Sequence, residues 1–254
     1  MKPPTFLSFV FSMDIAGADK QYVRSLFNAI AYRYDLLNHL LSGGIDLYWR
    51  RKAVEHLRPD APRTILDVAT GTGDFALAAL RLDPARVVGV DIAENMIAIG
   101  REKLRRHGAQ DRVTFELGDA ERLAFKDGTF DAAIVAFGVR NFENLNQGLR
   151  EMRRVLNPGG RVVILEFSRP QAAPFRQIYL AYFRTILPLI GRLVSGHTGA
   201  YTYLPDTVMR FPEGPAFLEQ LRASGFDDLR EERLTFGIAT MYSGRRSPLP
   251  ASPT

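Results

Sequence analysis

Residues 64–74, Thr-Ile-Leu-Asp-Val-Ala-Thr-Gly-Thr-Gly-Asp, constrain the fold of this chain more than any other segment. An apolar run ends in a glycine turn, and residues 75–82 then have a pattern typical of a helix. Gly71 and Gly73 permit a ligand to approach the backbone, because glycine has no Cβ. The third glycine of a dinucleotide fingerprint is missing, so a Rossmann dehydrogenase is a poor match. Taken alone, the turn is equally compatible with a simple connection between a strand and a helix.

Further strand patterns follow in order and favour an open α/β sheet with a nucleotide-type site. Residues 86–91 form a buried-strand pattern that ends in Asp91, about 20 residues after the glycine turn, where a ribose-binding acid is expected. Residues 94–106 have an amphipathic helical pattern. Residues 113–119 predict a third strand, which ends in Asp119, an acceptor able to read an adenine amino group.

The second half of the sheet is predicted from shorter signals. Residues 130–136 predict a fourth strand, and a helix follows at about 144–156. Asn-Pro-Gly-Gly at 157–160 is a turn by its own chemistry, and it leads into a fifth strand at 161–167. Two more strands are expected at about 228–234 and 237–243.

Several motifs in these segments resemble the motif series of class I S-adenosylmethionine-dependent methyltransferases. The matching segments are residues 67–74, 89–96, 118–125 and 156–160. More narrowly, the chain resembles the quinone C-methyltransferase family of ubiquinone and menaquinone biosynthesis. The segments that carry this narrower resemblance are Phe-Gly-Val-Arg-Asn at 137–141, Leu-Glu-Phe-Ser-Arg-Pro at 165–170, residues 27–38, Gly-Ile-Asp at 44–46 and Trp-Arg at 49–50.

The resemblance implies an α/β fold: a doubly wound, seven-stranded, Rossmann-like methyltransferase sheet with the strand order 3-2-1-4-5-7-6. A single methyltransferase domain is expected at 22–246, with an N-terminal helical cap at 22–60 and a helical substrate-side insertion at 171–212. Residues 1–21 are expected to be a flexible leader, and translation could start at Met1 or at Met13. The leader imitates a signal peptide weakly, but its apolar run is short. Residues 247–254 are expected to be a disordered tail.

The resemblance also implies a function. S-adenosyl-L-methionine would be the cofactor, and its methyl group would pass to a ring carbon of a polyprenylated demethylquinol. Residues 36–46 favour demethylmenaquinol, which gives menaquinol. A 2-polyprenyl-6-methoxy-benzoquinol of ubiquinone biosynthesis stays open, as does a small-molecule methyltransferase acting on oxygen or nitrogen. A non-catalytic cofactor-binding subunit is disfavoured, because Gly71 and Asp91 are intact.

The family pattern, carried over position by position, names candidate site residues. The expected cofactor-binding residues are Thr70, Gly71, Thr72, Gly73, Asp91, Ile92, Asp119, Ala120, Ala136 and Tyr32. The expected substrate contacts are Tyr34, Phe137, Phe183 and Leu187. Ala136 departs from the serine that is frequent in the family, so a hydroxyl contact is lost there. For Tyr32 and Tyr34, packing of an amphipathic helix is the alternative.

Arg140 and Asn141 are the predicted catalytic residues. The methyl group of a sulfonium is already activated, so the enzyme must align the reactants and exclude water, and it needs no metal. Carbon becomes the nucleophile when the quinone is reduced and a phenolic proton is lost. Arg140 keeps its charge and can stabilise the phenolate directly or through an oriented water, while Asn141 holds the other oxygen. The alternative for Arg140 is a surface ion pair at a strand end.

Composition limits the partners. The chain has no cysteine and four scattered histidines, so we expect no disulfide, no zinc–thiolate site and no other metal site. A net charge of +5 suggests an anionic partner. No aromatic and basic RNA-binding motif is visible, so we expect no nucleic acid and a loose attraction to anionic lipid instead.

Residues 175–194 are the most apolar segment, but arginines and Pro188 interrupt the run. The segment is either a helix that packs on the sheet or a lid over an apolar substrate that contacts the bilayer. We therefore expect a cytoplasmic enzyme that sits transiently on the inner face of the cell membrane, with a homodimer left open.

Overall fold

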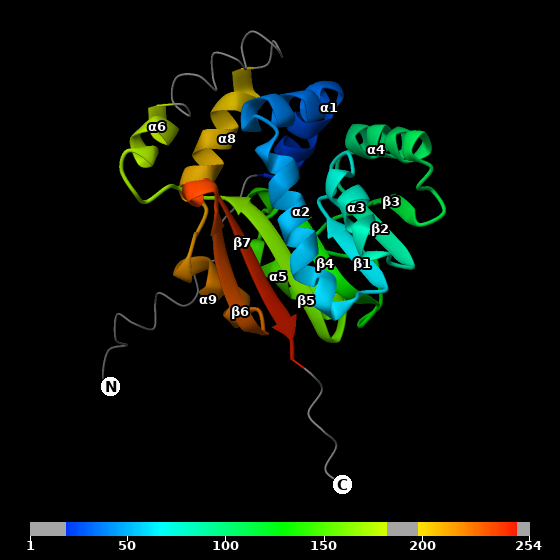
Figure 1. Cartoon of the computed structure of the whole chain (residues 1–254). Coiled ribbons are helices and arrows are strands. Elements are labelled where there is room, and N and C mark those ends of the chain that lie inside the picture. Colours follow the sequence, from blue (N-terminus) through cyan, green and yellow to red (C-terminus); the bar gives the residue numbers. More distant parts are fainter. Residues whose placement is uncertain (1–18, 182–197, 248–254) are drawn as a thin grey trace, which may run out of the picture.

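The computed structural model describes residues 19–181 and 198–247, and they contain a seven-stranded sheet with helices on both faces (Figure 1). The strand order is β3-β2-β1-β4-β5-β7-β6, which confirms the order predicted from the sequence. The strands are β1 (Thr64–Val68), β2 (Arg86–Asp91), β3 (Val113–Leu117), β4 (Phe130–Ala136), β5 (Leu156–Phe167), β6 (Phe226–Leu234) and β7 (Ala239–Arg246). The first five strands pair in parallel, whereas β7 is antiparallel to β5 and β6.

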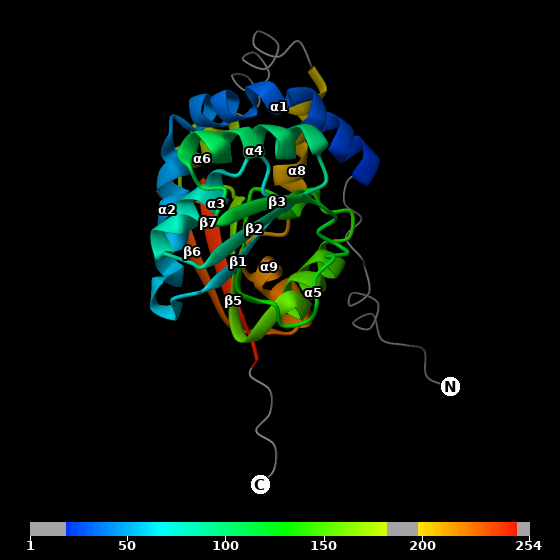
Figure 2. The same cartoon turned by 90° about the vertical axis from the view of Figure 1, so that its right-hand side faces the viewer.

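Two hydrophobic clusters cover the two faces of the sheet. On one face lie α2 (Ile45–Leu57), α3 (Asp74–Ala79) and α4 (Glu94–His107), and on the other lie α5 (Leu145–Val155) and α9 (Pro215–Ala223) (Figure 2). Successive residues of a strand point to opposite faces, so Ile65 and Leu66 of β1 belong to different clusters. Both faces of the central strands are therefore dry, and their sequences read as nearly continuous apolar runs.

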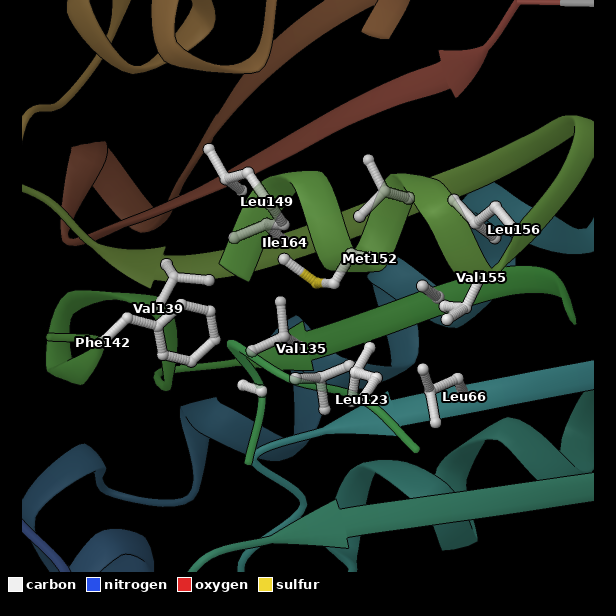
Figure 3. Packing of buried hydrophobic residues seen from close by; sticks show 14 of the residues in the cluster. Leu66, Leu123, Val135, Val139, Phe142, Leu149, Met152, Val155, Leu156 and Ile164 are labelled. Atoms are coloured by element: carbon white, nitrogen blue, oxygen red, sulfur yellow. The ribbon is translucent and has the colours of Figure 1, made fainter. Parts of the chain in front are cut away.

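The contact between α5 and the sheet shows how this core is built. Leu149, Met152 and Val155 share one side of α5 at helical spacing, and they point toward Val135 and Ile164 of the strands below (Figure 3). The helix begins after Asn144, whose side chain accepts a hydrogen bond from the backbone N–H of Gln147.

A third group of helices lies at the carboxyl ends of the parallel strands (Figure 1). It consists of α1 (Lys20–Ser42), α6 (Phe175–Ala181) and α8 (Thr198–Arg210). The helix α1 contacts α2, α4 and α8, and so it spans this end of the sheet. Its first residue, Lys20, falls inside the segment expected to be a leader. Residues 1–18, most of the predicted tail, and the predicted substrate contacts Phe183 and Leu187 lie outside the described residues.

The boundaries differ from the sequence prediction in several places. The strand β3 ends at Leu117, two residues before Asp119, β6 begins two residues earlier than expected, and β7 is shifted toward the C-terminus. The helix after the glycine turn ends as α3 at Ala79, and a 3₁₀ turn, η4 (Leu80–Leu82), completes the segment. The strand β5 begins at Leu156 and includes the Asn-Pro-Gly-Gly segment, because Leu156 already pairs with Phe130 before the register shifts. Three further 3₁₀ turns are η3 (Arg58–Asp60), η5 (Val139–Asn141) and η7 (Thr235–Gly237). No helix in the described ranges is long and apolar enough to span a bilayer.

Candidate cofactor and substrate site

The site lies where the strand order reverses, between β1 and β4. Ala69 follows β1 and Phe137 follows β4, and both have positive φ angles, of 52° and 59°. The two turns nearly touch, since a Cβ placed on Gly138 would lie 2.7 Å from the Cβ of Ala69. Open α/β sheets bind ligands in the crevice at such a reversal, outside the carboxyl ends of the strands. Left-handed backbone at two non-glycine residues is strained, and such strain is common at functional sites.

A pocket of about 650 Å³ opens from this crevice. Acidic residues line it at the ends of β2 and β3, and helix α1 closes its other side. The predicted site residues in its lining are Tyr34, Gly71, Asp91, Ile92, Asp119, Ala120, Ala136, Phe137 and Asn141. Six of the ten predicted cofactor positions and three substrate or catalytic positions therefore meet in one cavity.

Asp91 is fixed by backbone donors. Its Oδ2 accepts a hydrogen bond from the N–H of Gly71 at 2.8 Å, and its Oδ1 accepts one from the N–H of Ala93 at 2.9 Å. Burial raises the pKa of Asp91, while the backbone N–H groups of Ala93, Gly71 and Ile92 oppose that rise. Each carboxylate oxygen can still accept a second bond, which is what a pair of ribose hydroxyls requires.

Both glycines of the turn have positive φ angles, a backbone conformation that favours glycine. Gly73 has a φ of 89°, and a Cβ there would lie 2.2 Å from Cζ of Phe115, so no larger residue fits. Above Gly71, a Cβ would lie 3.7 Å from the ring of Tyr34, which shows that the tyrosine from α1 lies over the turn. Burial raises the pKa of this tyrosine hydroxyl.

Lys20 lines the larger pocket and forms an ion pair with Asp119. Its Nζ lies 2.8 Å from Oδ2 of Asp119, 3.3 Å from Glu121 and 3.8 Å from Glu143. Asp119 Oδ1 also accepts a hydrogen bond from the backbone N–H of Glu121 at 2.9 Å. The sequence contains no indication of this lysine, because its partners lie 99 or more residues further along the chain and no local pattern predicts the contact.

A second pocket, of about 310 Å³, adjoins the first and contains the rest of the glycine turn. Four lining residues are common to both pockets: Tyr34, Ala69, Gly71 and Ala136. Thr70 and Thr72 line only the smaller one. Thr70 donates a hydrogen bond to Asp67 at 2.6 Å, and Thr72 bonds to Asp35 of α1 and accepts from Lys103 of α4 at 3.1 Å. Burial raises the pKa of Asp67 to about 7.

The two predicted catalytic residues lie side by side in η5 but have different surroundings. Asn141 lines the larger pocket, and its Oδ1 accepts a hydrogen bond from the hydroxyl of Tyr203 at 3.1 Å. Arg140 is outside that lining, and its side chain is only 7% exposed. Its Nη1 lies 2.7 Å from Oε1 of Glu166, which is fully buried, so the pair is a buried one and differs from the surface pair considered as an alternative. The Nε of Arg140 is buried without a hydrogen-bond partner in the described structure.

Two of the predicted cofactor-binding residues, Tyr32 and Gly73, lie outside the linings of both pockets. Tyr32 is 86% exposed and lies outside both linings, whereas Tyr34 on the same helix faces the site. Gly73 shapes the turn without lining either pocket. The described ranges hold no cluster of three or more acidic or histidine side chains that could bind a metal ion.

A family model, described as the ubiE/COQ5 methyltransferase family, matches residues 15–246. The chain belongs to this family. A Bacteroides fragilis protein named demethylmenaquinone methyltransferase is 46% identical over 231 residues, which cover 91% of this chain and 94% of the relative. A Geobacter sulfurreducens protein named ubiquinone/menaquinone biosynthesis C-methyltransferase UbiE is 49% identical, with 88% of each chain covered. The family predicted from the sequence is confirmed.

Solved structures agree on the fold. Magnesium protoporphyrin IX methyltransferase from Synechocystis, determined with bound S-adenosylhomocysteine, covers 90% of this chain and 100% of its own with a TM-score of 0.63 at 19% identity. The cofactor of the family, S-adenosylmethionine, fits the residues present here: paired acids suit its ribose and adenine, and the open glycine turn suits close backbone approach.

Proposed function

We propose that this enzyme transfers a methyl group from S-adenosylmethionine to a ring carbon of a polyprenylated demethylquinol, converting demethylmenaquinol to menaquinol. The observation that carries the proposal is the position of Asn141. It lines the larger pocket and adjoins Arg140 in η5. A hydroquinone that entered beside Asn141 would meet an amide and a fixed positive charge near its oxygens. Relatives named for this reaction are similar to the chain over most of its length.

The bound cofactor supplies an electrophilic methyl group, and the protein must supply the carbon nucleophile. Deprotonation of one phenolic oxygen places electron density on the ring carbon beside it. The carbon then attacks the methyl group, and S-adenosylhomocysteine leaves. The carbon loses its hydrogen as a proton and the phenolate oxygen regains one, so one proton is released overall. The protein therefore has to stabilise a phenolate in a site that excludes water.

Arg140 and Asn141 suit that task. The guanidinium of Arg140 is permanently charged, and burial in a low-dielectric site strengthens its effect on a nearby anion. Glu166 binds Nη1 of Arg140, and Nε of Arg140 has no hydrogen-bond partner among the described residues. Asn141 keeps its orientation through the bond from Tyr203, and its amide group can donate to the second quinol oxygen. These residues act by charge and position, and none needs to accept a proton itself.

The test is methylation by the purified enzyme of two reduced substrates, a short-chain demethylmenaquinol and a short-chain 2-prenyl-6-methoxy-benzoquinol. Menaquinol formation from the first, dependent on prior reduction, supports the proposal. Turnover of the benzoquinol alone would assign the enzyme to ubiquinone biosynthesis instead. Methylation of an oxygen or nitrogen acceptor, with neither quinol used, would contradict the proposal.

A contact with the membrane surface follows from the proposed substrate, since a prenylated quinol resides in the bilayer. Large apolar side chains are exposed around the junction of α1 and α2, at the end of the sheet where the site opens. They are Tyr32, Leu36, Ile45, Leu47 and Tyr48. The net charge of +5 favours anionic lipid. We propose that this apolar surface lies on the cytoplasmic face of the membrane while the substrate enters.

Vesicle flotation tests the membrane contact. Leu47→Glu should lower the fraction of enzyme that floats with anionic vesicles. Leu117, which is 55% exposed on β3, provides a matched control, and Leu117→Glu should float like the wild type. Equal flotation of both variants would place the membrane contact elsewhere on the protein, and a wild type that does not float would contradict the membrane contact.

Sedimentation of the purified wild type without vesicles would test the homodimer that the sequence leaves open.

A further inference from the structure

Arg50 is a buried cation that the catalytic scheme does not use. It lies on α2, is 6% exposed and lines the smaller pocket. Its Nε is buried and has no hydrogen-bond partner in the described structure. A buried donor without a partner costs free energy, and the residue that carries it lines a pocket, so the chemistry of that pocket bears on the role of Arg50.

One end of the guanidinium is held by an ion pair. Nη1 of Arg50 forms an ion pair with Asp46, one turn earlier in the same helix. Asp46 is itself fixed by Ser42 at 2.7 Å and by His39 at 3.0 Å. The ring of Phe137 lies 5.6 Å from the Cζ of Arg50. The guanidinium is therefore held in one orientation before a ligand arrives, which lowers the entropy cost of binding.

The charges of the smaller pocket suit a zwitterion. Of its described lining residues, Arg50 is the one cation, while Asp67 and Asp74 are acids. Lys103 is close, but it already contacts Asp35 at 2.5 Å and Asp74 at 2.6 Å. The guanidinium of Arg50 therefore has N–H groups available for an anionic group, and the carboxylate of Asp67 can accept a hydrogen bond from a cationic group.

The cofactor has two such ends. If the proposed function holds, its adenosine part occupies the larger pocket, between Asp91 and Asp119. Because the two pockets share Gly71 and three other lining residues, the amino acid part enters the smaller one. We propose that Arg50 binds the α-carboxylate of this amino acid part. The ionised partners give a charge-assisted hydrogen bond, which is stronger than a neutral one.

A purely structural role for Arg50 is the competing explanation, since its ion-pair partner Asp46 also bonds to Ser42 and His39 and so joins α2 to α1. Two ligands separate the explanations. S-adenosylhomocysteine carries the α-carboxylate, and its decarboxylated analogue keeps the ammonium and the adenosine but lacks the carboxylate. Binding of each is measured by calorimetry on the wild type, on Arg50→Gln and on Arg50→Lys. Arg51→Gln is the matched control, because Arg51 is the next residue of α2 and is exposed.

Arg50→Gln should weaken binding of S-adenosylhomocysteine by about 10- to 100-fold, the range for a hydrogen bond to a charged group. Binding of the decarboxylated analogue should stay near the wild-type value, so the variant no longer prefers the ligand with the carboxylate. Arg50→Lys should lose part of the preference, since an ammonium cannot reproduce the planar fork. Arg51→Gln should retain all of it.

Each other result has a distinct meaning. Equal weakening of both ligands in Arg50→Gln and Arg50→Lys would assign Arg50 a structural role and overturn the inference. Unchanged binding of S-adenosylhomocysteine in Arg50→Gln would also overturn it, while the proposed function stands. If the wild type binds neither ligand, the proposed function itself fails. Thermal unfolding of each variant without ligand checks that the comparison is made on folded protein.

Discussion

Arg140 has two roles in this account, and one pair of variants separates them. Arg140 is 7% exposed and Glu166 is fully buried, so Arg140→Ala leaves a buried carboxylate without its ion-pair partner. Breaking a buried pair in this way costs about 3–5 kcal/mol of unfolding free energy. Loss of one preorganised donor to a developing oxyanion lowers turnover by about 10²- to 10³-fold. The single variant should therefore be both less stable and much slower.

The double variant Arg140→Ala with Glu166→Gln removes the stranded charge. Its free energy of unfolding, measured with urea at pH 7, should recover most of the loss. Its single-turnover rate with a reduced short-chain demethylmenaquinol and saturating cofactor should stay low. Arg140→Lys should recover only part of the rate. Recovery of the rate together with stability would refute the catalytic role, because it would show that Arg140 serves only to neutralise Glu166.

The pH dependences of the two defects have opposite signs. Burial already raises the pKa of Glu166, and loss of Arg140 raises it further. A carboxyl whose folded pKa exceeds its unfolded value destabilises the fold as pH rises, so the stability defect of Arg140→Ala should shrink toward acid pH. The turnover defect should shrink toward alkaline pH, because the solvent then supplies the phenolate. A shared pH dependence would contradict the assignment of two roles.

Three other predictions concern the rest of the site. Asp91→Ala should weaken S-adenosylmethionine binding by roughly 1.5–3 kcal/mol, as measured by calorimetry, and an unchanged dissociation constant would remove Asp91 from the ribose site. Burial raises the pKa of Asp67 to about 7 in the folded state, above its ordinary value. The free energy of unfolding of the ligand-free wild type should therefore fall as the pH rises from about 4 to about 7. Asp67→Asn should flatten that loss in urea titrations, and an unchanged slope would contradict the shifted pKa. From the sequence alone, replacing Phe183 and Leu187 by Ser should abolish the dependence of rate on prenyl length while cofactor affinity persists; unfolding of that variant would favour a core role.

The fold was predictable because its signals are local. The strand that ends in Asp91 is a short apolar run, and Asp119 follows a strand of alternating pattern. The turn at Gly71 follows from residues that are adjacent in the sequence. The family pattern then supplied the strand order, which the structure confirms. The turn at 157–160 was placed correctly, but its inclusion in β5 depends on pairing with Phe130, a tertiary contact that no local rule contains.

Contacts within the site could be predicted only where both contacting residues belong to one sequence motif. Tyr32 and Tyr34 were both expected at the pocket, yet residues two apart on a helix point in different directions, and only Tyr34 faces it. Lys20 meets Asp119 from 99 residues away. The pairing of Arg140 with Glu166 was hidden for the same reason, although both residues lie in recognised motifs. Their contact depends on the register between β4 and β5.

The most direct test of the central claim is the position of the transferred methyl group. The purified enzyme is given S-adenosylmethionine with a ¹³C-labelled methyl group and a reduced short-chain demethylmenaquinol, and the product is analysed by NMR. The label should appear on the ring carbon, as an aryl methyl group, and only when the quinone has been reduced. A labelled methoxy group, or equal labelling of the oxidised quinone, would contradict this claim.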